Sequence, residues 1–226
     1  MITLPPVIQS VIGRALDTMR SHPQHQLLPV YRLPISQTLR TTYGIAVSDP
    51  IRARLGLATA RRVLPLWHAA MPLYPPPDEP GVDPNRLPDY FLHLVEQAFQ
   101  PNADLDIIKQ EASDYWYVVG NIEEEIFEWR HETNGPLFYA FYALDTAYLA
   151  LHETLGYELL GRLQHWEKHS DDTLPRFACD AASSAVIALS GGGYRSGPPI
   201  NVEKRRAFWE WWLLEALPIA CSEAAG

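Results

Sequence analysis

The sequence is poor in cysteine, and it lacks both a long apolar run and a basic amino-terminal segment. Its two cysteines, Cys179 and Cys221, are too few for a disulfide scaffold and favour a reduced, intracellular protein. The longest apolar stretch, from Pro136 to Leu151, is interrupted by Asp145, which indicates a buried helix rather than a membrane span. The first ten residues, MITLPPVIQS, have no basic n-region, so they do not resemble a signal peptide. We therefore expect a cytoplasmic protein without a membrane partner.

Basic residues are outnumbered, and the net charge of −9 is unevenly distributed. Residues 1–70 contain eight arginines and two acids, whereas the remaining residues contain ten basic and 25 acidic side chains. The first part therefore carries a charge of +6 and the rest a charge of −15. Because an acidic surface repels nucleic acids and membranes, this distribution favours a basic protein as the partner.

Hydrophobic residues make up 47% of the chain and charged residues 20%, which is typical of a folded globular protein. The strongest periodic signal is an apolar stripe with alternating spacings of three and four residues, as in a bundle helix. Its members are Leu105, Ile108, Ala112, Tyr115, Val119, Ile122, Ile126 and Trp129. The stripe predicts one helix of 25 residues, with Asp104 at its start and a turn at residues 134–136 after it.

The amino-terminal third gives weaker signals. An apolar face predicts a helix over residues 5–20, whereas residues 22–47 show no sustained period and are predicted to be irregular. The Ser-Asp-Pro sequence at 48–50 predicts an N-cap and a helix that runs to about residue 70, with an interruption near Gly56 or Pro65. Residues 72–88 contain seven prolines, which predict an extended surface loop.

The carboxy-terminal half predicts further helices. Residues 136–168 form one helix or two, divided near Gly156, and the nearly all-apolar first half is predicted to be central. Thr173 is predicted to cap an alanine- and serine-rich helix, which ends near Ser190 in a flexible glycine-rich loop over 189–199. Asn201 is predicted to cap a last helix that Pro218 ends. The prediction is therefore an all-α, multi-helix bundle with an irregular amino-terminal region and a proline-rich surface loop, in a single domain over residues 1–226.

No segment carries a recognisable catalytic motif. The glycine-rich sequence LSGGGYRSG at 189–197 lacks the lysine and the preceding strand of a phosphate-binding loop. Neither cysteine nor Ser190 lies in a nucleophile motif. Asp145 is interpreted as a structural carboxylate, hydrogen-bonded to tyrosines or to an arginine inside the bundle. We therefore expect no enzymatic activity and no cofactor.

The closest approach to a metal site is a helical set with spacing i, i+4 and i+7, which includes one ExxH motif: Glu124, Glu128 and His131. A di-iron bundle needs two such motifs and two further glutamates, all pointing inward. Here His93 and Glu96 give only an acid–imidazole pair on another helix. The side chains of Glu124, Glu128 and His131 are predicted to face away from the apolar stripe. A helical-bundle metalloprotein or enzyme that uses these residues is kept as the alternative hypothesis, and an assembly protein that docks through the proline-rich loop is a third.

The acidic residues near the end of the predicted 25-residue helix, and just after it, are the predicted partner-binding site. Residues 101–132 contain nine acids against Lys109 and Arg130. A surface of one charge sign speeds the encounter with a surface of the opposite sign and fixes its orientation. The residues predicted to contact the partner are Glu123, Glu124, Glu125, Glu128 and Glu132.

Two stretches resemble a known family. RRVLPLWHAAMP at 61–72 and EKRRAFWEWWLLEALPIA at 203–220 are similar to the all-helical immunity proteins of bacterial polymorphic toxin systems, specifically the fifth numbered family. The resemblance implies a cytoplasmic protein that neutralises a toxin by binding it, without catalysis, and it transfers no site residues. Together with the acidic surface, it leads to a basic toxin domain as the expected partner. The tryptophan cluster itself is predicted to be core, with Trp209 and Trp212 on the apolar face and Trp211 at its edge.

Overall fold

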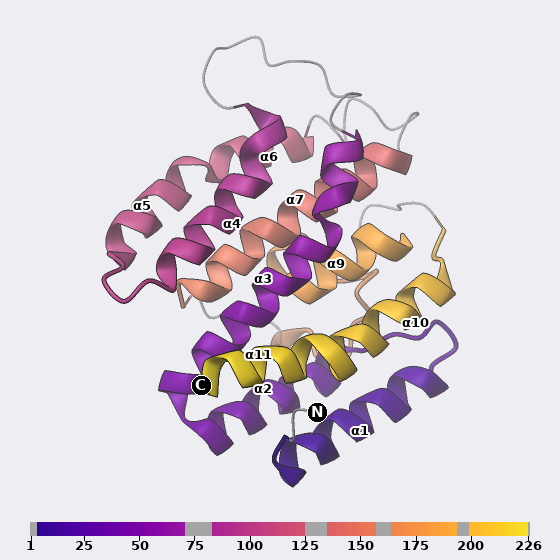
Figure 1. The fold of residues 1–226 in the computed structure, drawn as a ribbon. Helices are drawn as coiled ribbons and strands as arrows, with labels where there is room; N and C mark the ends of the chain where they lie inside the picture. The colour runs from indigo at the N-terminus through magenta and orange to yellow at the C-terminus, as the bar shows by residue number, and fades with distance from the viewer. Residues whose placement is uncertain (1–3, 71–82, 125–134, 157–163, 194–198, 226) are drawn as a thin grey trace.

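The computed structural model describes residues 4–70, 83–124, 135–156, 164–193 and 199–225. Within these ranges the chain forms helices joined by turns and contains no strand, which confirms the predicted all-α bundle (Figure 1). None of the helices in these ranges is both long enough and apolar enough to cross a membrane.

Two long helices, α3 (Ile45–Ala70) and α7 (Gly135–Thr154), run through the middle of the bundle and pack against each other (Figure 1). Helix α7 is buried on nearly every side, as its apolar sequence predicts. The two helices approach closely at Gly56, where a Cβ atom would lie 3.3 Å from the Cβ of Ala150. A side chain at this position would crowd α7, so the glycine allows the close spacing of the two helices.

The predicted start of α3 at residues 48–50 and its predicted interruption near Gly56 or Pro65 are wrong. The helix begins at Ile45 and continues through Pro50 and Pro65. A proline inside a helix removes one backbone hydrogen bond and destabilises the isolated helix. Helix α3, however, packs against α2, α4, α7, α9 and α11, and this tertiary packing outweighs the local preference.

The amino-terminal region is more regular than predicted. Helix α1 (Pro6–Ser21) matches the predicted first helix. The irregular structure predicted over 22–47 is wrong for residues Pro29–Tyr43, which form α2 and pack against α1 and α3. The apolar period of α2 is hidden in the sequence because Arg32, a charged residue, occupies a buried position between the apolar residues of its inner face.

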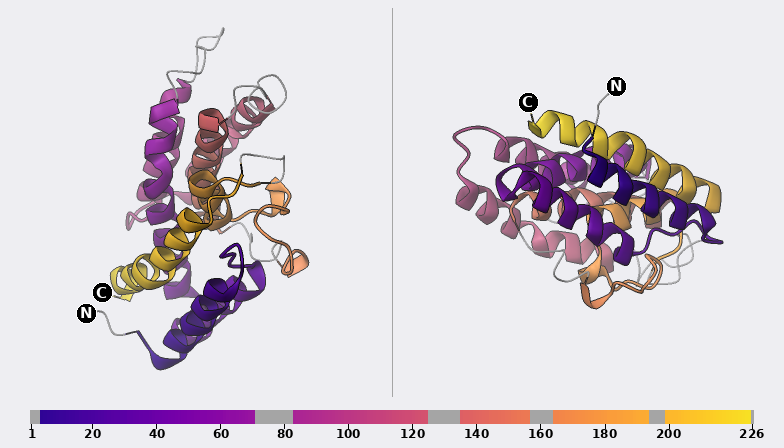
Figure 2. Two further views of the ribbon diagram at one scale, coloured as in Figure 1. Left: turned by 90° about the vertical axis from the view of Figure 1, so that its right-hand side faces the viewer. Right: turned by 90° about the horizontal axis from the view of Figure 1, so that it is seen from below.

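A layer of shorter helices covers one side of the central pair. After the single turn η2 (Pro84–Arg86), helix α4 (Leu87–Ala98) packs on α7, and α5 (Leu105–Asp114) and α6 (Trp116–Glu124) follow. The predicted 25-residue helix is therefore broken at Tyr115, although its stripe is confirmed at four buried positions. Those positions are Ile108, Ala112, Val119 and Ile122. Figures 1 and 2 place α5 and α6 at the edge of the molecule, on the side away from α10.

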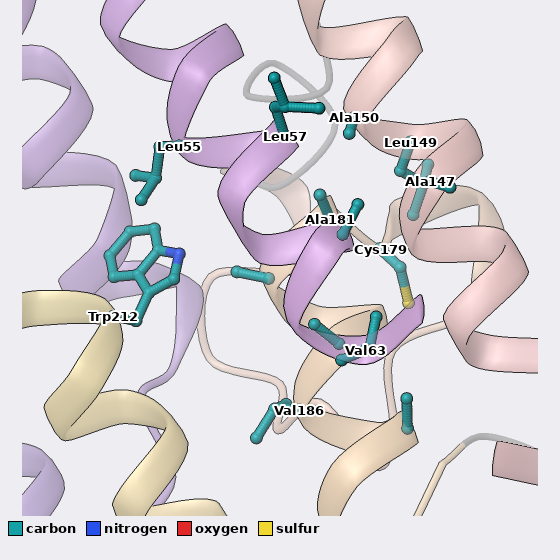
Figure 3. Packing of buried hydrophobic residues seen from close by; sticks show 14 of the residues in the cluster. Leu55, Leu57, Val63, Ala147, Leu149, Ala150, Cys179, Ala181, Val186 and Trp212 are labelled. Carbon is teal, nitrogen blue, oxygen red and sulfur yellow. The ribbon is translucent and has the colours of Figure 1, made fainter. Parts of the chain in front are cut away.

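Helix α9 (Ala181–Ser190) follows the short turn η4 (Arg176–Ala178) in the chain. Its small residues pack against α7 and α3. Figure 3 labels Ala147 and Ala150 of α7 and Ala181 of α9 among the buried residues of this core. The predicted end of this helix at Ser190 is confirmed. The predicted cap at Thr173 is wrong, because Asp180 caps α9 by accepting a hydrogen bond from the backbone N–H of Ser183.

The carboxy-terminal helix runs from α10 (Val202–Trp211) through a π-helical segment, η5 (Trp212–Ala216), into α11 (Leu217–Ala225). Asn201 caps it, as predicted, but the predicted end at Pro218 is wrong. In the wider π turn the backbone N–H of Leu217 donates to the carbonyl of Trp212, and the helix continues past the proline. The tryptophan cluster is core, as predicted: Trp209 is fully buried and Trp212 packs beside Leu55 of α3 (Figure 3).

Candidate functional site

Two of the residues predicted to contact a partner, Glu123 and Glu124, lie at the end of α6, which together with α5 has one buried face and one exposed face. Asp104 caps α5 by accepting hydrogen bonds from the N–H groups of Asp106 and Ile107, at 3.1 and 3.2 Å. The buried face packs on α4 and α7. The exposed side chains recur every three or four residues and form what we call the outer face. They are Ile107, Gln110, Asp114, Tyr117, Asn121 and Glu124.

Acidic residues dominate the surface of these two helices. Residues 104–124 contain six acids and one base, Lys109, which lies 3.3 Å from Asp106. Of the predicted contact residues, Glu124 is exposed and Glu123 is partly buried. The other three, Glu125, Glu128 and Glu132, lie outside the described residues. The described part of the acidic region is therefore a negatively charged surface that can attract a basic protein.

A groove of about 460 Å³ lies between α4 and the junction of α5 and α6. Tyr90 and Tyr115 form one wall, with their ring centroids 4.8 Å apart, and Asp83, Asp89, Arg86 and His93 contribute polar groups. The hydroxyl of Tyr90 donates a hydrogen bond of 2.9 Å to Glu111. Burial and this hydrogen bond raise the pKa of Tyr90, so the phenol stays protonated and does not serve as a base.

The described residues of the alternative metal site are not brought together. His93 lies 3.0 Å from the side-chain nitrogen of Gln97, and Glu96 pairs with Arg61 on α3. Glu124 is exposed on the outer face of α6, while Glu128 and His131 lie outside the described residues. Among the residues that the structure describes, no three histidine, cysteine or acidic side chains form a group suited to a metal ion. Most of the proline-rich loop, residues 72–82, is likewise outside the described part of the chain.

Two buried arginines, Arg32 of α2 and Arg205 of α10, link helices and turns of the bundle, and the sequence analysis did not predict them. Arg32 of α2 is 3% exposed and donates to the carboxylate of Asp171 at 2.9 Å and to the hydroxyl of Ser183 at 2.7 Å. Its guanidinium also lies over the ring of Trp209, 5.2 Å from the centroid. These contacts join α2, α9 and α10 through one side chain. The sequence holds a signal for it, since Arg32 shares the spacing of the buried residues Ile35 and Leu39.

Arg205 of α10 makes the second such link. It is completely buried and forms a bidentate pair with Asp172, with distances of 2.9 and 2.8 Å, and it also donates to the carbonyl of Gly191. Gly192 has a φ of +87°, and a Cβ atom there would overlap the carboxylate of Asp172. The first glycines of the glycine-rich loop therefore form a structural turn around this ion pair. Arg205 lies four residues before Trp209, on the same helix face, and this spacing is the signal in the sequence.

Glu153, near the end of α7, lies beside a small cavity of about 40 Å³, lined in part by Arg32, Arg52 and Asp180. It accepts a hydrogen bond of 3.0 Å from the backbone N–H of Ala181 at the start of α9. Burial, together with the negative charge of Asp180, raises the pKa of Glu153 to about 7, although Arg52, the Ala181 hydrogen bond and Arg32 oppose the shift. The cavity has room for a few water molecules.

Asp145 is 1% exposed and accepts a hydrogen bond of 2.6 Å from the hydroxyl of Ser184. The predicted structural role is thus confirmed, with a serine of the neighbouring helix α9 as a donor.

Comparison with known proteins identifies the family. The family model described as Immunity protein Imm5 matches residues 12–219, which include all the helices from α2 to α10 and most of α1. A comparison with curated proteins gives no match. The family match agrees with the all-helical fold and with the resemblance of the segments at 61–72 and 203–220. The chain belongs to the Imm5 family of immunity proteins.

Proposed function

We propose that this protein neutralises a toxin protein by binding to it in the cytoplasm, and that it acts by binding alone. The membership of the Imm5 family over residues 12–219 is the observation that carries this proposal. The arrangement of the described titratable groups agrees with it. Tyr90 is held protonated by Glu111, and the carboxylates of Asp145 and Asp172 accept hydrogen bonds within the bundle.

The acidic surface of α5 and α6 is the proposed contact region, and a basic toxin domain is the proposed partner. The described part of this surface has six acids against one lysine, and α5 and α6 pack on the bundle with one face only. Complementary charge raises the association rate and disfavours acidic competitors. We include Glu123, Glu124, Glu125, Glu128 and Glu132 in the contact region.

The proposal is tested with the toxin-like product of the neighbouring gene. We expect the two purified proteins to elute as one complex in size-exclusion chromatography and to bind in calorimetry. We also expect co-expression of this protein to restore growth to cells that express the toxin. Absence of a complex with such a partner, together with failure to restore growth, would contradict the proposed function.

Charge reversal tests the contact region. The double variant Glu123→Lys/Glu124→Lys should weaken binding by about tenfold or more at low salt, and the loss should shrink at high salt. The triple variant Glu125→Lys/Glu128→Lys/Glu132→Lys extends the test to the other predicted contacts. A matched control, Glu203→Lys/Glu215→Lys, changes the net charge by the same amount as the double variant on exposed positions of the carboxy-terminal helix. Equal losses in the control and the double variant would mean that only the net charge matters and that the contact region is wrong.

A further inference from the structure

Two large apolar side chains stand out on the outer face of α5 and α6. Ile107 is 57% exposed and Tyr117 is 65% exposed, and Leu105 at the start of α5 is 41% exposed. The opposite face of the same helices is packed normally, with Ile108, Val119 and other residues at most 5% exposed. The exposure is therefore a property of one face and does not reflect loose packing of these helices.

Ile107 and Tyr117 lie on helices whose exposed charged residues are acidic. Ile107 and Tyr117 belong to one series with spacings of three and four residues, and acids stand between and after them in that series, namely Asp114 and Glu124. Ten residues of helix span about 15 Å, and the bend at Tyr115 makes the distance somewhat shorter. Both side chains thus fit within the central part of an interface that buries about 800 Å² on each partner.

We propose that Ile107 and Tyr117 are the anchor residues of the toxin-binding surface, and that the acids around them form its rim. This inference rests on the proposed function and names the chemistry of the partner: an apolar patch surrounded by lysine or arginine side chains. Protein interfaces commonly have an apolar centre and a polar rim, and tyrosine is enriched among the residues that contribute most to affinity. Acids near Ile107 and Tyr117, such as Asp106 and Asp114, match a basic ring around the patch.

The rim and the anchors should affect binding differently. Exposed charges act over distance and are screened by salt, so the acids should control mainly the association rate. Apolar side chains act only after contact, so Ile107 and Tyr117 should control mainly the dissociation rate. Salt therefore separates the two contributions: a loss caused by removing an anchor should persist at 0.5 M NaCl, where the Debye length falls to about 4 Å from about 30 Å at 0.01 M.

The experiment measures the binding kinetics of the full-length protein with the neighbouring toxin-like protein for four alanine variants. Ile107→Ala and Tyr117→Ala remove the anchors, and each should raise the dissociation constant about tenfold or more, through faster dissociation, at both low and high salt. Ile219→Ala and Phe177→Ala are the matched controls, because their side chains are 48% and 63% exposed on other elements. The controls should bind within about twofold of wild type. Since all four side chains are exposed, urea unfolding should show that each variant folds as stably as wild type to within about 0.5 kcal/mol.

The outcomes separate this inference from the proposed function. If wild type binds the toxin and both anchor variants bind within about twofold of it, the inference is wrong while the proposed function stands. An equal loss of affinity in Phe177→Ala or Ile219→Ala would also overturn it, because the anchors would then lie elsewhere. If wild type does not bind at all, the proposed function fails and the inference fails with it.

Discussion

The partly buried carboxylate of Glu153 makes the stability of this protein depend on pH in a predictable direction. Its pKa is raised from 4.5 to about 7 in the folded protein, chiefly by burial. A raised pKa means that the folded state binds the proton more tightly than the unfolded state does. The stabilising contribution of the proton is therefore complete below pH 4.5 and is lost as the pH rises through 7. A rise of the pKa from 4.5 to about 7 corresponds to at most about 3.5 kcal/mol.

Glu153→Gln removes the ionisation and keeps an oxygen that can accept the hydrogen bond from the N–H of Ala181. We expect the variant to equal wild type in unfolding free energy near pH 4.5, and to exceed it by about 1–3 kcal/mol at pH 8. The measurement is urea unfolding at four pH values between 4.5 and 8, followed by tryptophan fluorescence. Glu203→Gln, at an exposed position, serves as the control and should stay within about 0.5 kcal/mol of wild type throughout.

A difference between Glu153→Gln and wild type that does not change with pH would refute this reasoning. So would a variant that is less stable than wild type at pH 8, because the ionised carboxylate would then be stabilising at the start of α9. A less stable variant at pH 8 would mean that the attraction of the Glu153 carboxylate to Arg52 and Arg32 exceeds the free-energy cost of burying its charge.

Two further predictions concern the ion pair between α10 and the preceding turns. Arg205→Met removes the buried guanidinium that pairs with the partly buried Asp172 and should lower the unfolding free energy by about 3 kcal/mol, whereas Arg206→Met, at an exposed position, should change it by about 0.5 kcal/mol or less in urea unfolding. Gly192→Ala places an alanine at a position with positive φ, where its Cβ atom would clash with the same carboxylate. This variant should lower the unfolding free energy by about 3 kcal/mol or more. Gly13→Ala, in an open position of α1, should instead raise it by up to about 1 kcal/mol, and a similar effect of both glycine variants in calorimetry would contradict the structural role of the turn.

The fold class followed from the sequence because its apolar spacing repeats through most of the chain. The buried stripe of α5 and α6 was predicted from that spacing, helix α7 from its nearly all-apolar sequence, and the Asn201 cap from its residue type. The errors lie where local signals compete with tertiary packing. Pro65 and Pro218 sit inside helices that their neighbours stabilise, and Arg32 hides the inner face of α2.

The candidate site was predictable only in its charge. Acids at helical spacing indicated a negative surface, and the structure places Glu124 on an exposed face. The spacing of ten residues puts Ile107 and Tyr117 on one side of the predicted long helix, but the sequence alone did not show that these two side chains are left exposed in the folded bundle. Exposure of an apolar side chain depends on which elements pack beside it, and this is a property of the folded bundle.

The claim that the α5–α6 face binds the toxin is tested most directly by amide hydrogen exchange of this protein, alone and in complex with the toxin-like product of the neighbouring gene. We expect the toxin to slow exchange in peptides that cover residues 104–124, and to leave exchange in α1 unchanged. Slower exchange in α1 or α11 with no change over residues 104–124 would contradict the account.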